Sequence, residues 1–137
     1  MLSRINNEYG VVSKINVTNL EKSMTWYNDI LGLINDSKFY EPHVWAQLNC
    51  PGIKNFALGL SAHDSPIGSR GQTITFMIAD IKLARQILIE RDIMVTPIEE
   101  AGKGVLLVRF SDPDGNELLL RQNSSSVGHK VGDHIAY

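Results

Sequence analysis

The amino-acid sequence predicts an α+β fold made of two tandem modules, each with the element order βαβββ. The first observation is an internal repeat, because VSKINVTNLEKS, which contains Asn19, matches TITFMIADIKLA, which contains Asp80. In both copies a β-branched alternating run ends at the Asn or Asp, and a helical pattern begins. The second observation is that short apolar runs separated by turn residues follow each helical pattern, which is typical of strands.

The repeat predicts one strand and one helix at the start of each module. The side chains of Asn19 and Asp80 are expected to cap the helices by accepting hydrogen bonds from free amides of the first turn. Beyond these caps, apolar residues recur at helical spacing. They are Leu20, Met24, Tyr27 and Leu31 in the first copy, and Ile81, Ala84, Ile87 and Leu88 in the second.

Three strands are expected after each helix. The predicted ranges are about 33–39, 44–48 and 56–61 in module one, and about 94–96, 105–110 and 117–121 in module two. Turn signals separate these strands. One of them is DPDGN at 112–116, where Pro fixes φ, Gly accepts a positive φ, and Asp and Asn bond to the local backbone.

The length of 137 residues predicts a single domain, 1–137, because a second independent core has no room. Within it we expect module one at about 9–62, a linker at about 63–71, module two at about 72–122 and a tail at 123–137. The tail lacks periodicity, so it is expected to be mobile or docked on a partner.

Composition and charge restrict the class of partner. The chain is 43% apolar and 20% charged, with a formal net charge of -2, which is typical of an ordinary globular protein. It offers no cationic field for phosphates, so we expect neither nucleic-acid nor anionic-membrane binding. No apolar run could span a bilayer, the first residues are too polar for a signal sequence, and the single Cys50 agrees with a reducing compartment. A cytoplasmic location and a small organic ligand are therefore expected.

Strand alternation assigns side chains to the two faces of each predicted sheet. If Ile15 and Val17 pack under the first helix, their neighbours in the strand point to the opposite face, which is free to surround a ligand. The same parity applies to the other strands. The residues expected on the opposite faces are Val12, Lys14, Asn16, Ala57, Gly59, Ser61, Thr73, Thr75, Met77, Glu117, Leu119 and Arg121, with Arg109 if Phe110 is in the core.

Two such modules in one chain, with VTNLEKSMTWYNDILGL in the first and FSDPDGNELLL in the second, resemble the vicinal oxygen chelate superfamily. That superfamily includes glyoxalase I, extradiol dioxygenases, fosfomycin-resistance enzymes and bleomycin-binding proteins. The resemblance covers about residues 11–121. It implies curved sheets that enclose a cleft, and a homodimer in which modules are commonly exchanged.

The resemblance also implies four positions for metal ligands, one on each of four strands. In this sequence Val12, Thr73 and Leu119 stand at three of them, and the fourth falls at or near Gly59. Divalent catalytic metals need imidazole, carboxylate or thiolate donors. We therefore expect no metal and no cofactor, and we set aside the metal-dependent reactions of the superfamily.

Charged residues on the ligand-facing sides are the candidates for catalysis. Arg121 or Lys14 could bind an anionic or carbonyl oxygen while Glu117 acts as a base. The alternative is that these charges form salt bridges with one another at the rim of an apolar pocket. His43, near a hairpin end, is either a surface residue or an acid or base at the rim.

Aromatic residues are candidates for ligand binding because flat rings commonly contact apolar organic molecules. Trp45 could stack on a ligand or pack in the core, and Tyr40 flanks the same hairpin. Trp26 and Tyr27 are expected in the core. His63, next to Asp64, is interpreted as an ordinary loop residue.

Three functions remain open from the sequence. The first is a metal-independent protein that binds an apolar or aromatic ligand for sequestration, resistance or transport. The second is a cofactor-free isomerase, cyclase or lyase that acts on a carbonyl-containing or polyketide-like compound by general acid/base catalysis. The third is a scaffold whose cleft is filled by large side chains such as Leu119 and Met77.

Overall fold

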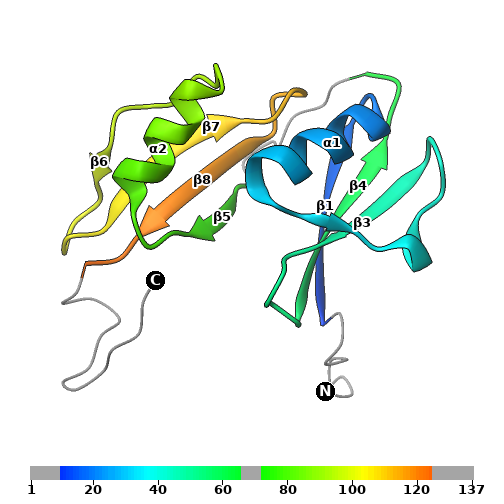
Figure 1. Ribbon diagram of the computed structural model, residues 1–137, viewed down its shortest axis with the longest axis horizontal. Helices are drawn as coiled ribbons and strands as arrows, with labels where there is room; N and C mark the ends of the chain where they lie inside the picture. The colour runs from blue at the N-terminus through cyan, green and yellow to red at the C-terminus, as the bar shows by residue number, and fades with distance from the viewer. Residues whose placement is uncertain (1–9, 66–71, 125–137) are drawn as a thin grey trace. The chain divides into compact units, whose positions relative to one another are not determined.

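The computed structural model describes residues 10–65 and 72–124, and these contain two four-stranded mixed sheets and two α-helices (Figure 1). The predicted α+β class and the two βαβββ modules are confirmed. The chain forms two compact units. Unit one holds the described residues up to Ser65 together with the turn Asp112–Asn116, and unit two holds the remainder. The tail beyond residue 124 and much of the predicted linker lie outside the described residues.

Unit one is built around sheet 1, in which the strand order is β1-β4-β3-β2. Its elements are β1 (Val11–Val17), α1 (Leu20–Leu31), β2 (Ile34–Asn35), a 3-10 helix (Ser37–Phe39), β3 (Trp45–Asn49) and β4 (Phe56–Ala62). The outer strand β1 runs parallel to β4, and the remaining pairs are antiparallel.

Unit two is built around sheet 2, which repeats the same topology in the order β5-β8-β7-β6. Its elements are β5 (Ile74–Met77), α2 (Ile81–Glu90), β6 (Glu99–Glu100), β7 (Leu106–Ser111) and β8 (Glu117–Gln122). The β5–β8 pair is parallel and the others are antiparallel.

Both predicted helix caps are confirmed. Asn19 Oδ1 accepts from the Lys22 amide at 3.1 Å, and Asp80 Oδ1 accepts from the Leu83 amide at 3.1 Å. Each bond satisfies one of the amides that a helix leaves unpaired at its start. The sharp strand-to-helix connection in each module therefore follows directly from one polar residue.

Two of the predicted strands are wrong. The range 33–39 contains only the two-residue β2, because the carboxylate of Asp36 accepts from the Lys38 amide and starts a 3-10 helix instead. In the range 94–96, Val95 makes only an isolated bridge with Phe110. The strand that pairs with β7 at the edge of that sheet is β6, formed by Glu99 and Glu100 opposite Leu107 and Leu106.

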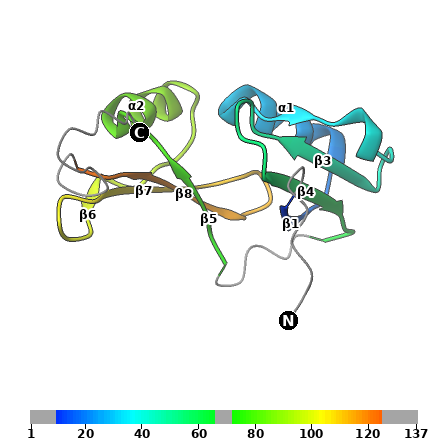
Figure 2. The same cartoon turned by 90° about the horizontal axis from the view of Figure 1, so that it is seen from below.

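Each helix packs on one face of its own sheet (Figure 2). Under α1 lie the fully buried Leu58 and Leu60 of β4, and Tyr27 of α1 is itself completely buried. Under α2 the corresponding buried residues are Val108, Leu118 and Leu120. We call the opposite face of each sheet its helix-free face. No helix in the described part of the chain is long and apolar enough to cross a membrane.

Candidate functional site

The helix-free face of sheet 1 carries the residues that strand alternation predicted. In β1, Ile15 and Val17 are buried, whereas Lys14 is exposed and Asn16 is half-buried. Strand register then aligns the helix-free side chains into rows, since residues paired across strands share a face. These rows are Val12, Ala57 and Asn49; Lys14, Gly59 and Gln47; and Asn16, Ser61 and Trp45.

Trp45 lies across Gly59 on this face. A Cβ atom added to Gly59 would come within 2.2 Å of Cη2 and 2.7 Å of Cζ2 of the indole. The ring therefore rests directly on the backbone of β4, a position that glycine alone permits. We call Trp45 together with Gly59 the Trp45 platform.

Polar side chains surround the Trp45 platform. Ser61 Oγ lies 3.4 Å from His63 Nε2, both on the same side of β4 or its continuation. Across the strand pair, Asn16 stands opposite Ser61, and its buried Oδ1 has no hydrogen-bond partner among the described residues. On the other side of the platform, Gln47 is buried, with 7% of its surface exposed.

A second polar group lies at the β2 edge of the same face. Asp36 is buried and accepts from Asn49 Nδ2 at 3.4 Å and from the Lys38 amide at 3.0 Å. The Asp36 amide donates to the Gln47 carbonyl at 2.8 Å, which continues the sheet beyond β2. This face is thus polar at both ends and aromatic at its centre.

The helix-free face of sheet 2 carries Thr73, Thr75, Met77, Arg109, Glu117, Leu119 and Arg121. Glu117 Oε1 accepts from Arg109 Nη1 at 3.0 Å and from the Thr73 hydroxyl at 3.3 Å. Arg121 Nε donates to Asn123 Oδ1 at 2.8 Å. Arg109 and Glu117 are 42% and 44% exposed, so solvent screens their pair strongly.

Two predicted site residues lie elsewhere in unit one. His43 has 87% of its side chain exposed, and its Nδ1 lies 3.1 Å from Glu21 Oε1 on α1. The structure therefore attaches it to the helix and does not bring it to the Trp45 platform. Tyr40 is half-buried at the end of the 3-10 helix.

The turn Asp112–Asn116 is held by a buried carboxylate. Asp112 Oδ2 accepts from the Tyr27 hydroxyl at 2.6 Å and from Asn116 Nδ2 at 2.8 Å, while Asp112 Oδ1 accepts from two turn amides. Burial, followed by the Asp112 charge and hydrogen bond, raises the pKa of Tyr27 far above its ordinary value. Tyr27 therefore acts as a permanent donor in this network.

Cys50, which follows β3, is half-buried, and desolvation raises the pKa of its thiol. A raised pKa lowers the thiolate fraction near neutral pH, so this thiol is a poor nucleophile.

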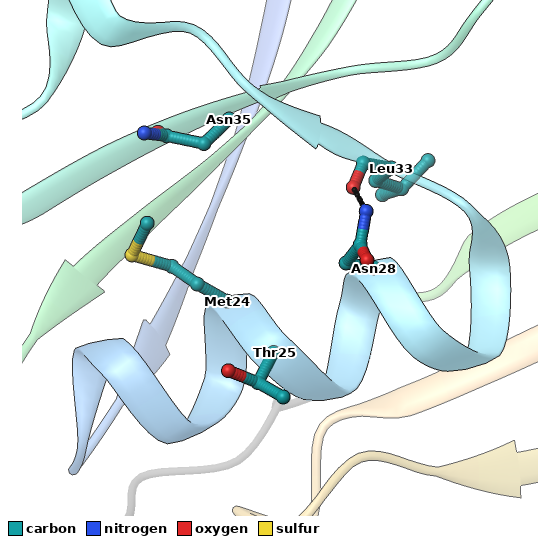
Figure 3. A pocket seen from close by; sticks show the side chains of 5 residues that line it. All are labelled: Met24, Thr25, Asn28, Leu33 and Asn35. Carbon is teal, nitrogen blue, oxygen red and sulfur yellow. Dashed lines mark hydrogen bonds between the residues drawn. The ribbon is translucent and has the colours of Figure 1, made fainter.

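A shallow pocket of about 250 Å³ opens between α1 and β2 (Figure 3). It is lined by Met24, Thr25, Asn28, Leu33 and Asn35. Within the pocket, Asn28 Nδ2 donates to the Leu33 carbonyl at 3.0 Å, so these two polar groups already bond to each other. None of the predicted site residues lines it.

The four positions that the resemblance implies for a metal do not fit a divalent ion. The side chains of Val12 and Leu119 have no donor atom, and Gly59 has no side chain and lies under the Trp45 ring. The Thr73 hydroxyl is engaged with Glu117. Among the described residues, no three His, Cys, Asp or Glu side chains gather as possible ligands.

The fold and these positions can be compared with known proteins. The sequence model of the glyoxalase/bleomycin resistance protein/dioxygenase superfamily matches residues 9–120. The chain belongs to this superfamily. The match covers both modules, as the resemblance implied.

Solved structures of the superfamily fold agree. A superfamily member from Sphaerobacter thermophilus is 28% identical, with a TM-score of 0.68 over 82% of this chain and 94% of that one. The antibiotic binding protein TnmS3 from Streptomyces is 24% identical, with a TM-score of 0.65 over 83% and 96%. The fosfomycin resistance protein FosX from Listeria monocytogenes is 14% identical, with a TM-score of 0.69 over 92% and 98%. No curated protein sequence matches the chain.

Sequence reasoning placed Ser61 on the ligand-facing side without giving it a role, and it did not select His63 or Gln47 as site residues of this superfamily member. The alternation that placed Ser61 on the helix-free face extends by parity to His63, and this spacing was the available signal. The contact between Trp45 and Gly59 gave no such signal, because it depends on the register between β3 and β4.

Proposed function

We propose that this protein binds a planar aromatic or otherwise apolar organic molecule without a metal ion, in a sequestration, resistance or carrier role. One observation carries the proposal. The benzene ring of the Trp45 indole lies against Gly59 on the helix-free face of sheet 1, with polar groups around it. Such a ring offers a large stacking surface, and the surrounding polar atoms can orient a ligand.

The superfamily comparison supports a small-molecule ligand. TnmS3, which shares the fold, is an antibiotic binding protein, and FosX is a fosfomycin resistance protein. The donor chemistry at Val12, Gly59, Thr73 and Leu119 argues against a metal-dependent reaction in this chain. Elemental analysis that finds about one divalent ion per chain after dialysis would overturn metal independence.

The proposal is tested with naphthalene-2-sulfonate, a planar anion, by NMR of the tryptophan indole N–H groups. The chain has two tryptophans, so a Trp26→Phe variant assigns both signals. Trp26 lies on α1 in edge contact with Tyr27, at 4.9 Å between ring centroids, and serves as the internal control.

We expect the Trp45 signal to shift on titration while the Trp26 signal stays in place. Trp45→Leu should abolish binding, whereas Trp26→Phe should leave the affinity unchanged. Equal shifts of both signals, or a Trp45→Leu variant that binds like the wild type, would contradict the proposal.

A cofactor-free isomerase, cyclase or lyase is the alternative. Its proposed base, Glu117, already accepts hydrogen bonds from Arg109 and Thr73. Both bonds occupy Oε1 and hold the carboxylate against Arg109 and Thr73, which disfavours proton abstraction from a ligand by this oxygen. The binding proposal is therefore preferred.

We also propose that the protein is a homodimer, as the superfamily resemblance implies, and that it is cytoplasmic, in agreement with the single Cys50. Light scattering tests the dimer, because a monomer of this chain has a mass of 15.3 kDa. A mass near that value at micromolar concentrations would remove the dimer and leave the binding proposal intact.

A further inference from the structure

We infer that Asn16, Ser61 and His63 form a hydroxyl-binding subsite beside the Trp45 platform, so that the protein selects planar aromatic ligands that carry a hydroxyl group. This inference rests on the proposed function and deepens it. It concerns which aromatic molecules the platform accepts.

Strand register places the subsite at the edge of the ring. Ser61 of β4 is paired with Asn16 of β1 on one side and with Trp45 of β3 on the other. Side chains paired in this way have Cβ atoms about 4.5–5.5 Å apart on one face of the sheet. A ligand stacked on the Trp45 ring thus lies one side chain away from the Ser61 hydroxyl, and two from the Asn16 amide.

The groups at this position supply both halves of a hydroxyl's hydrogen bonding. Asn16 Oδ1 is a buried acceptor without a partner among the described residues, so it lacks a donor. Ser61 Oγ and His63 Nε2 lie 3.4 Å apart, so one of them donates to the other. The pair keeps one further hydrogen, the Ser61 O–H or an N–H of the His63 ring, that can be donated to a ligand. A hydroxyl that donates to Asn16 and accepts from Ser61 or His63 satisfies both.

Other ligand groups satisfy fewer of these atoms. A carbonyl or ether accepts only, which leaves Asn16 Oδ1 unpaired. An ammonium donates only, and it would also meet Lys14, which lies two residues before Asn16 on the same exposed face. The chemistry of the site therefore favours a neutral group that both donates and accepts.

The test compares two probes that differ by one hydroxyl, naphthalene-2-sulfonate and 6-hydroxynaphthalene-2-sulfonate. Dissociation constants are measured from the Trp45 indole signal in the full chain at neutral pH, where the added hydroxyl is un-ionised. The ratio of the two constants isolates the hydroxyl from the stacking of the ring. The variants are Ser61→Ala and Asn16→Leu, with Ser37→Ala on the exposed 3-10 helix as the matched control.

We expect the wild type to bind the hydroxylated probe about fivefold more tightly, which is the size of one neutral hydrogen bond. Ser61→Ala and Asn16→Leu should each reduce the ratio to below about twofold, and Ser37→Ala should keep it. If the Trp45 signal shifts but the wild type binds both probes equally, the subsite is wrong and the proposed function stands. If Ser61→Ala and Asn16→Leu both keep the wild-type ratio of the two dissociation constants, the subsite is also wrong. If neither probe shifts the Trp45 signal, the proposed function fails and the subsite fails with it.

Discussion

Replacing Tyr27 with Phe removes one hydrogen bond from the buried carboxylate that holds the Asp112–Asn116 turn in unit one. The Tyr27 hydroxyl donates to Asp112 Oδ2 at 2.6 Å, and Asp112 is only 5% exposed. The turn makes further bonds to β1 and the residue after it. Asn116 Nδ2 donates to the Asn16 carbonyl, and the Thr18 hydroxyl donates to Asp114 at 2.6 Å.

The expected magnitude follows from counting donors on the carboxylate. A hydrogen bond to a charged group contributes about 1.5–3 kcal/mol. Tyr27→Phe keeps the ring and leaves Asn116 Nδ2 on the same oxygen, so its cost should lie near the low end, at about 1.5–2 kcal/mol. In the wild type each Asp112 oxygen accepts two hydrogen bonds. Asp112→Asn replaces one of these oxygens with an NH2 donor, so two bonds are lost and the cost should be larger, about 3–5 kcal/mol.

The assay is equilibrium unfolding in urea, monitored by tryptophan fluorescence. Trp26 and Trp45 both belong to unit one, so the signal reports on the unit that contains the network. Tyr40→Phe is the matched control and should stay within about 0.5 kcal/mol of the wild type. A Tyr27→Phe variant as stable as Tyr40→Phe would refute the reasoning.

Three further predictions follow from named contacts. The pKa of Tyr27 in the folded state is raised above its unfolded value of about 10, so its contribution to the free energy of unfolding is complete below about pH 10 and is lost progressively above it. Above pH 10, urea titrations should show the free energy of unfolding of the wild type falling by about 1.4 kcal/mol per pH unit more than that of Tyr27→Phe. Asn19→Ala removes the N-cap bond to Lys22 and should cost about 1 kcal/mol, and an unchanged urea midpoint would contradict the cap. Glu117→Gln should lower the free energy of unfolding by less than about 1 kcal/mol, since the ion pair of Glu117 with Arg109 is nearly half exposed. The affinity for naphthalene-2-sulfonate should be unaltered. A larger loss of stability, or any loss of affinity, would contradict this assignment of Glu117 as a surface ion-pair residue.

The parts of the fold that could be predicted depend on local, repeated signals. Asn19 and Asp80 cap their helices as expected, because capping involves only the neighbouring residues. The faces of Lys14 and Asn16 followed from the alternation with buried Ile15 and Val17. These signals are strong because each is fixed within a few residues.

The parts that could not be predicted depend on competition between local structures or on contacts between strands. Asp36 could continue a strand or cap a turn, and its bond to the Lys38 amide decides for the 3-10 helix. Glu99 and Glu100 carry no apolar alternation, yet they form β6 through the backbone. The Trp45 platform requires the pairing of β3 with β4, which no single stretch of sequence encodes.

The Trp45 platform is tested most directly by the affinity of Gly59→Ala for naphthalene-2-sulfonate. The new Cβ atom would lie 2.2 Å from the indole, so the ring must leave its position on β4. An aromatic contact is worth about 0.5–1.5 kcal/mol beyond burial, so the account predicts about twofold to tenfold weaker binding, with the Trp26 signal unchanged. Wild-type affinity in Gly59→Ala would contradict the claim that the ring on Gly59 forms the binding surface.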